Sequence, residues 1–190
     1  MSFDFPAFGG AGPVPIRIRV PTDVTSAVLD FCKEVEPSET PVFIQVTPSD
    51  WAKPLECYSN VAWQIRRYGG RSQYGWRIGE IPNEFIEAEF HTVWVDDTRR
   101  LVDLTPTVSG DGNRILFLPS TSKIYQCQCI PNVRKALANT PYVMNLMTLG
   151  PLIERQRLSV TPQAYDDAKP NDPCPCASGK KFKKCCQYRW

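Results

Sequence analysis

Residues 74–104 read YGWRIGEIPNEFIEAEFHTVWVDDTRRLVDL, and the expected fold follows from this stretch. Two runs within it, Tyr74 to Ile81 and Phe85 to Val95, are rich in the aromatic and β-branched residues that favour strands. A third run, Leu101 to Leu104, comes after the polar segment Asp96 to Arg100, which suits a hairpin loop. Because neighbouring strands joined by short loops pair antiparallel, the centre of the chain is predicted to be an antiparallel sheet.

Helical patterns lie on both sides of this centre. Apolar residues recur at helical spacing from a cap at Thr22 or Asp23 to about Val35, and again from about Cys57 to Tyr68. The residues beyond Pro131 continue in a helical pattern. We therefore predict an α+β fold with helices packed on an antiparallel sheet. Further strands are predicted at Pro13–Val20, Val42–Val46 and Ile115–Leu118.

The length and composition suit one domain with a small appendage. We predict an α+β domain over residues 1–158, a polar linker over 159–172 and a small module over 173–190. The net charge of +2 argues against a general electrostatic attraction to nucleic acid or membranes. No apolar run is long enough for a membrane span. The first residues carry no secretory signal, so we expect a cytoplasmic protein with reduced thiols.

Four of the eight cysteines lie close together near the C-terminus. Their spacing is C-x-C-x8-C-C, and two close pairs separated by a turn suit a tetrahedral ion. The segment between the pairs has a single large apolar residue, Phe182, so its folding is expected to depend on the metal. The predicted metal ligands are Cys174, Cys176, Cys185 and Cys186.

These residues resemble the SEC-C motif, a zinc-binding tail found on the SecA translocation ATPase and on other bacterial proteins. The family pattern is roughly C-P-C-G-S-G-K-K-[YF]-K-x-C-[CH], and this chain departs from it at Ala177. The resemblance implies a structural zinc ion and, in several members, contact with proteins or ribosomes. An unliganded tail or disulfides are the alternative. The lysines of the loop either contact an acidic partner or RNA, or only balance the thiolate charge: Lys180, Lys181, Lys183 and Lys184.

His91 is the only histidine of the chain. If the loop after Val95 has five residues, Val95 faces Leu101 and Val93 faces Asp103. His91 and Asp103 are then diagonal neighbours on one face of the sheet. A two-residue loop would turn Asp103 to the opposite face.

Cys57 lies at the predicted start of a helix, where the helix dipole favours a thiolate. The order Cys57, His91, Asp103 resembles the transglutaminase-like and papain-like cysteine hydrolases. That resemblance implies that Cys57 is the nucleophile, His91 the general base and Asp103 the residue that orients the ring. The oxyanion donor is expected to be Gln45 or the backbone N–H of Cys57. In the alternative interpretation the three residues are a buried helix residue, a strand histidine and a cap.

Two functions therefore remain open. One is an enzyme, a thiol hydrolase or acyltransferase acting on amide or peptide bonds; the other is an adaptor that binds a protein or ribosomal partner through the zinc module. Cys32 is expected in the core, and Cys127 and Cys129 are expected to be structural. Nearby tryptophans could line a groove, but Trp63 is expected to be buried in the core. The sequence names no substrate, partner or oligomeric state.

Overall fold

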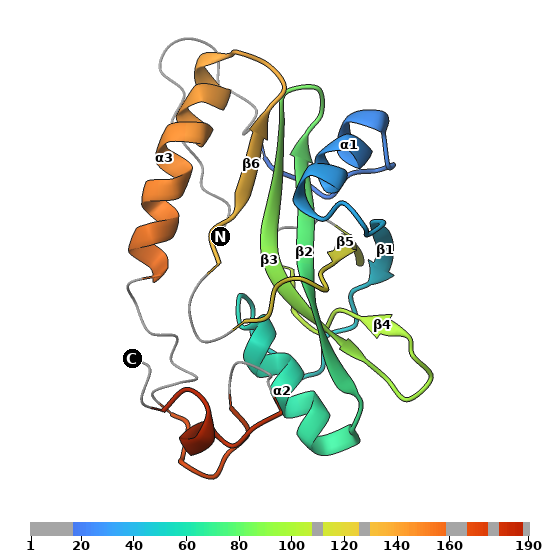
Figure 1. The fold of residues 1–190 in the computed structure, drawn as a ribbon, viewed down its shortest axis with the longest axis vertical. Coiled ribbons are helices and arrows are strands. Elements are labelled where there is room, and N and C mark those ends of the chain that lie inside the picture. The colour runs from blue at the N-terminus through green and yellow to red at the C-terminus, as the bar shows by residue number, and fades with distance from the viewer. Residues whose placement is uncertain (1–16, 108–111, 126–129, 159–166, 175–178, 188–190) are drawn as a thin grey trace.

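The computed structural model describes residues 17–107, 112–125, 130–158, 167–174 and 179–187 (Figure 1). Three helices accompany a mainly antiparallel sheet, which confirms the predicted α+β class. None of the helices in the described ranges is long and apolar enough to cross a membrane. The elements in chain order are α1 Ser26–Val35, β1 Val42–Gln45, α2 Cys57–Tyr68, β2 Arg71–Ile81, β3 Phe85–Val95, β4 Leu101–Val102, β5 Arg114–Pro119, β6 Val133–Ala136, α3 Pro141–Leu158 and the short 3-10 helix η1 Phe182–Lys184.

The long strands β2 and β3 form the centre of the sheet. They pair along their whole length, from Arg71 opposite Val95 to Ile81 opposite Phe85. The strand order is β1-β5-β2-β3-β4, and β6 pairs with β3 as well. Gly75 permits the close pairing of β2 with β5, because a Cβ atom at this position would lie 2.3 Å from the carbonyl oxygen of Leu118.

A backbone bridge connects the two ends of this strand order. Val46, after β1, and Asp103, after β4, form an isolated parallel bridge. The N–H of Thr47 donates to the carbonyl of Asp103 at 2.7 Å, and the N–H of Asp103 donates to the carbonyl of Gln45 at 3.0 Å. Because β1 and β4 are the terminal strands of the order, this bridge makes the sheet nearly barrel-shaped.

The hairpin between β3 and β4 has the predicted odd register. Val95 lies opposite Leu101, which confirms the five-residue loop. The carboxylate of Asp96 holds this loop, since Oδ1 accepts from the N–H of Thr98 at 2.8 Å and from the N–H of Arg100 at 2.9 Å. The aspartate at the loop start therefore supports the register on which the face of Asp103 depends.

The prediction of helix beyond Pro131 is wrong for its first part. Residues Val133–Ala136 form β6, which pairs with β3 from Ala88 opposite Val133 to Phe85 opposite Ala136. The edge of β3 offers unpaired backbone groups there, and satisfying them outweighs a weak helical pattern. The helix α3 begins only at Pro141.

The N-terminal predictions need smaller corrections. The helix α1 begins at Ser26 with Thr25 as its cap, not at Thr22 or Asp23, because the Thr25 hydroxyl accepts from the N–H of Val28 at 3.3 Å. The predicted strand up to Val20 is reduced to a single bridge between Arg19 and Glu80, and its first residues lie outside the described ranges.

The main core lies between α1 and one face of the sheet, where Phe31 and Trp76 are almost fully buried. Cys32 is also buried, as predicted, and burial raises the pKa of its thiol to about 12. A buried carboxylate, Glu36, ends α1. It accepts from Trp76 Nε1 at 3.1 Å and from Ser120 Oγ at 2.6 Å, so it connects the helix to β2 and the end of β5.

Replacing this carboxylate should reduce stability. We expect Glu36→Ala to lower the free energy of unfolding by about 3 kcal/mol, because the buried indole N–H and the hydroxyl lose their acceptor. The half-buried Glu39, three residues further on, offers a matched control, and Glu39→Ala should change stability by about 0.5 kcal/mol or less. Urea denaturation followed by circular dichroism measures both values. Equal effects of the two substitutions would contradict the role given to Glu36.

Candidate functional site

Cys57 is the first residue of α2 and is 7% exposed. The preceding residue, Glu56, takes the N-cap position without a side-chain hydrogen bond to the helix. The first N–H groups of α2 therefore have no side-chain cap from this residue, and the positive end of the helix dipole lies beside the thiol.

The side chain of Asn60 holds the loop that leads into this helix. Its Nδ2 donates to the carbonyl of Lys53 at 2.8 Å, and its Oδ1 accepts from the N–H of Lys53 at 3.0 Å. Nδ2 also lies 3.4 Å from Thr105 Oγ1. Asn60 thus connects the start of α2 to the segment that follows Asp103. Asparagine is unfavourable inside helices because its side chain competes for backbone hydrogen bonds. An asparagine three residues after Cys57 was therefore a sequence signal that this side chain bonds to the backbone of a neighbouring loop.

His91 and Asp103 meet as the hairpin register predicted. His91 Nε2 lies 3.1 Å from Asp103 Oδ1, and both side chains are buried. The contact is close but poorly aligned, since Nε2 has no hydrogen bond of good geometry within the described part of the chain. Asp103 Oδ1 also accepts from the N–H of Thr105 at 2.9 Å, which orients the carboxylate.

The pKa of His91 depends on both of the other predicted site residues, Asp103 and Cys57. Burial lowers the pKa of His91, but the negative charge of Asp103 and the interaction with Cys57 outweigh it and hold this pKa well above its usual range. Both Asp103 and Cys57 therefore favour the protonated form of His91. A thiol, an imidazole and a carboxylate are the groups that thiol catalysis uses.

Tyr58 connects the same helix to the histidine strand. It follows Cys57 in α2, and its hydroxyl donates at 3.4 Å to the carbonyl of Phe90, the residue before His91. The ring of Tyr58 stacks on Tyr125 with the ring centres 3.9 Å apart. Sequence periodicity gives no signal for this contact, because it joins positions far apart in the chain.

Two predictions near the site change. Gln45 has an exposed side chain on β1, and it contacts the site through its backbone carbonyl, which accepts from Asp103. Trp63 is 44% exposed rather than buried in the core. It lies on the outer face of α2, where the guanidinium of Arg66 is 5.2 Å from its ring. Cys127 and Cys129 lie outside the described residues.

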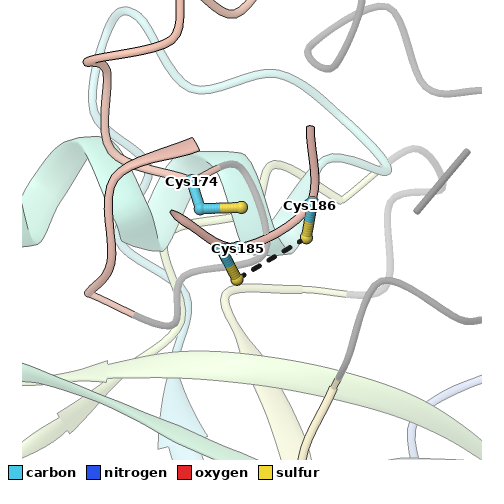
Figure 2. Close-up of side chains that lie close together, drawn as sticks. All are labelled: Cys174, Cys185 and Cys186. Carbon is cyan, nitrogen blue, oxygen red and sulfur yellow. Dashed lines mark hydrogen bonds between the residues drawn. The ribbon is translucent and has the colours of Figure 1, made fainter. Parts of the chain in front are cut away.

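Three of the four predicted metal ligands lie together in the C-terminal segment. The sulfur atoms of Cys174, Cys185 and Cys186 all lie within 4.8 Å of one another (Figure 2). The Sγ atoms of Cys185 and Cys186 are 3.7 Å apart. An ion with four sulfurs at about 2.3 Å in tetrahedral geometry places neighbouring sulfurs about 3.8 Å apart, so this spacing suits a metal ion. Cys176 lies outside the described residues.

The oxidation state of this cluster affects what it can bind. Cys174 and Cys185 are not in disulfides, whereas Cys186 is in one. A cysteine cannot be in a disulfide and be a thiolate ligand at the same time, so the cluster holds a metal ion only in its reduced form.

The comparison with known proteins supports the motif and not the main domain. Residues 171–187 match the SEC-C motif, which is less than a tenth of the chain. No solved structure matches the chain. The chain therefore carries a SEC-C motif with a cysteine cluster that can hold a metal ion. Nothing in these comparisons supports the transglutaminase-like resemblance of the main domain.

The raised pKa of His91 predicts a particular dependence of stability on pH. The protonated ring is favoured in the folded state, so its pairing stabilises the protein fully below about pH 6.5 and loses this effect as the pH rises through the folded-state pKa. We expect the unfolding free energy of the wild type, relative to His91→Gln, to be largest near pH 6 and to fall toward alkaline pH. Urea denaturation across this range measures the difference. A constant difference would mean that the pKa of His91 is the same in the folded and unfolded states, which would contradict the prediction.

Proposed function

We propose that this protein is a zinc-binding thiol hydrolase or acyltransferase that acts on amide or peptide bonds. Two observations support the proposal: His91 Nε2 lies 3.1 Å from Asp103 Oδ1, and Cys57 contributes, with Asp103, to the raised pKa of His91. A buried histidine with a purely structural role needs only one hydrogen-bond partner. Here it interacts with a nucleophile and with an acid, which is the arrangement that thiol catalysis requires.

The proposed reaction uses these groups in sequence. The Cys57 thiolate attacks the carbonyl carbon of the substrate, forming a C–S bond, and His91 gives its proton to the leaving amine as the C–N bond breaks. His91 then takes a proton from water, which attacks the thioester and releases a carboxylic acid and the thiolate. An amine in place of water gives acyl transfer. Asp103 keeps the ring oriented and stabilises its positive charge.

The start of α2 supports this chemistry. The negative oxygen that develops on the substrate needs donors that are already oriented, and the backbone N–H of Cys57 at the helix start is such a donor. The side chain of Gln45 is exposed on β1, so the backbone N–H of Cys57 is the better candidate for the oxyanion donor. Leu55, two residues before Cys57, has a φ of 65° and is 55% exposed. Strain of this kind in a non-glycine residue is typical of functional loops.

The zinc part of the proposal rests on donor chemistry. Four thiolates from Cys174, Cys176, Cys185 and Cys186 would complete a tetrahedral shell, leaving no position for substrate, so the ion is structural. Both sites need reduced cysteines, and we therefore include a cytoplasmic location in the proposal.

One observation supports the adaptor as a second candidate. Four exposed lysines around η1 put positive charge on this surface, which suits an acidic protein or ribosomal RNA: Lys180, Lys181, Lys183 and Lys184. If the protein is only an adaptor, Cys57→Ala leaves its activity unchanged.

Alkylation rates test the enzyme. At neutral pH, iodoacetamide should modify Cys57 at least about tenfold faster than the buried Cys32, because Cys57 is partnered by an imidazolium. His91→Ala should slow the modification of Cys57 about tenfold or more, and Asp103→Asn should slow it less. Mass spectrometry of the peptides gives the rate at each cysteine. If Cys57 and Cys32 react equally, or if His91→Ala has no effect in a folded variant, the proposal fails.

Metal content tests the second part. Protein purified under reducing conditions should contain about one zinc per chain. Losing one of four ligands should cost about a quarter of the 10–16 kcal/mol typical of such sites, so Cys185→Ser should weaken zinc binding about a hundredfold or more. Cys57→Ser, which lies outside the cluster, is the control and should keep the wild-type affinity. Competition with a coloured chelator measures both, and unchanged affinity in Cys185→Ser would refute the tetrathiolate.

A further inference from the structure

The C-terminal segment shares the core of the main domain. Cys174, Phe182 and Cys186 are buried, and they belong to the same apolar cluster as Tyr125 and the residues that pack between α1 and the sheet. Figure 1 shows this segment beside α2. Phe182 is the single large apolar side chain between the cysteine pairs, and here it is buried in the core of the domain rather than in one of its own.

The C-terminal segment lies along one side of α2. Arg66 of α2 forms an ion pair with Asp172 at 3.6 Å. A cavity of about 290 Å³ lies between Ala62 and Ile65 of α2 and Lys181 of the segment. A second groove, of about 550 Å³, is lined on one side by α2 and the loop before it, and on the other by residues 167, 168, 172 and 173. The two parts thus meet along much of the helix that begins with Cys57.

Backbone hydrogen bonds within the C-terminal segment connect the residues that contact the main domain to the cysteines. The N–H of Phe182 donates to the carbonyl of Asp172 at 2.8 Å, and the N–H of Cys174 donates to the carbonyl of Lys180 at 2.8 Å. Residues Pro173 and Lys181 form an antiparallel bridge between these two bonds. Asp172 and Phe182, which contact the main domain, therefore lie close in the chain to the cysteines that can hold a metal ion, in a structure too short to have a core of its own.

Tyr58 connects this packing to the thiol site. Its ring packs against the shared apolar cluster, and it stacks on Tyr125, which is part of that cluster. It is also the neighbour of Cys57 in the chain, and its hydroxyl donates to the carbonyl before His91. Movement of the C-terminal segment would alter the packing of Tyr58 and with it the relative position of Cys57 and His91.

We infer that metal binding at the cysteine cluster holds the first turns of α2 in place and thereby controls the reactivity of Cys57. Without the ion, the segment has too little core of its own to stay folded. Phe182 then leaves the shared apolar cluster, Asp172 leaves Arg66 of α2, and the thiol loses its alignment with His91. The inference about Cys57 reactivity rests on the proposed thiol function, whereas the effect on α2 does not.

Two measurements on the full chain test this inference. Hydrogen exchange of the α2 amides should become at least about tenfold faster when zinc is removed with a chelator under reducing conditions. The central pair β2 and β3 serves as the internal reference and should change much less. In the same samples, iodoacetamide should modify Cys57 several-fold more slowly once zinc is removed. Unchanged exchange in α2 would overturn the inference.

Substitutions that keep the ligands separate the packing from the metal. Phe182→Ala should retain zinc and still speed exchange in α2, while Phe182→Leu should restore the wild-type behaviour. Arg66→Ala should have a smaller effect in the same direction, and Arg67→Ala is its matched control. If the chelator unfolds the whole chain, the exchange rates of these variants test the inference instead. Exchange in α2 as slow in zinc-loaded Phe182→Ala as in the wild type would then refute it.

The outcomes also distinguish this inference from the proposed function. If α2 responds to zinc while His91→Ala leaves the alkylation of Cys57 unchanged, the coupling stands and the thiol function fails. If His91→Ala slows alkylation but zinc removal changes neither α2 exchange nor the Cys57 rate, the thiol function stands and the coupling fails.

Discussion

The backbone bridge between Val46 and Asp103 is the contact on which the rest of the structure depends. It joins the two terminal strands of the sheet, so the sheet closes nearly into a barrel instead of ending in two open edges. The two hydrogen bonds of the Asp103 backbone, to Thr47 and Gln45, hold this residue at the closure. Its side chain then lies beside His91. The feature that completes the sheet therefore also positions the acid of the candidate site.

This position has an energetic cost that the site itself offsets. A buried carboxylate or imidazolium is unfavourable when it is alone, and the removal of one partner from a buried pair is strongly destabilising. Here Asp103 accepts from the backbone of Thr105 and contacts His91, which in turn interacts with Cys57. A purely structural pair would be replaceable by apolar side chains, so the presence of a thiol as third member favours a chemical role.

The helix α2 relates this site to the cysteine cluster. Its first residue is Cys57, and its outer face carries Arg66, which pairs with Asp172 close to the ligands. A segment as short as the SEC-C motif cannot bury enough apolar surface by itself. Packing Phe182 into the core of the main domain supplies that surface, and it makes the motif part of the domain that carries the thiol.

Local patterns in the sequence determined the elements themselves. The helix Cys57–Tyr68 and the register of Val95 opposite Leu101 were predicted as they are found, because helical periodicity, a glycine stop and a loop length are properties of neighbouring residues. The spacing of the terminal cysteines predicted, in the same way, a cysteine cluster that can hold a metal ion. The tertiary structure alone decided that Val133–Ala136 pairs with the edge of β3. It also decided that Trp63 of α2 is exposed, while the C-terminal segment lies against another part of the same helix. These outcomes depend on which surfaces meet in space, and backbone groups or side chains far apart in the chain compete for them in ways that no local pattern encodes.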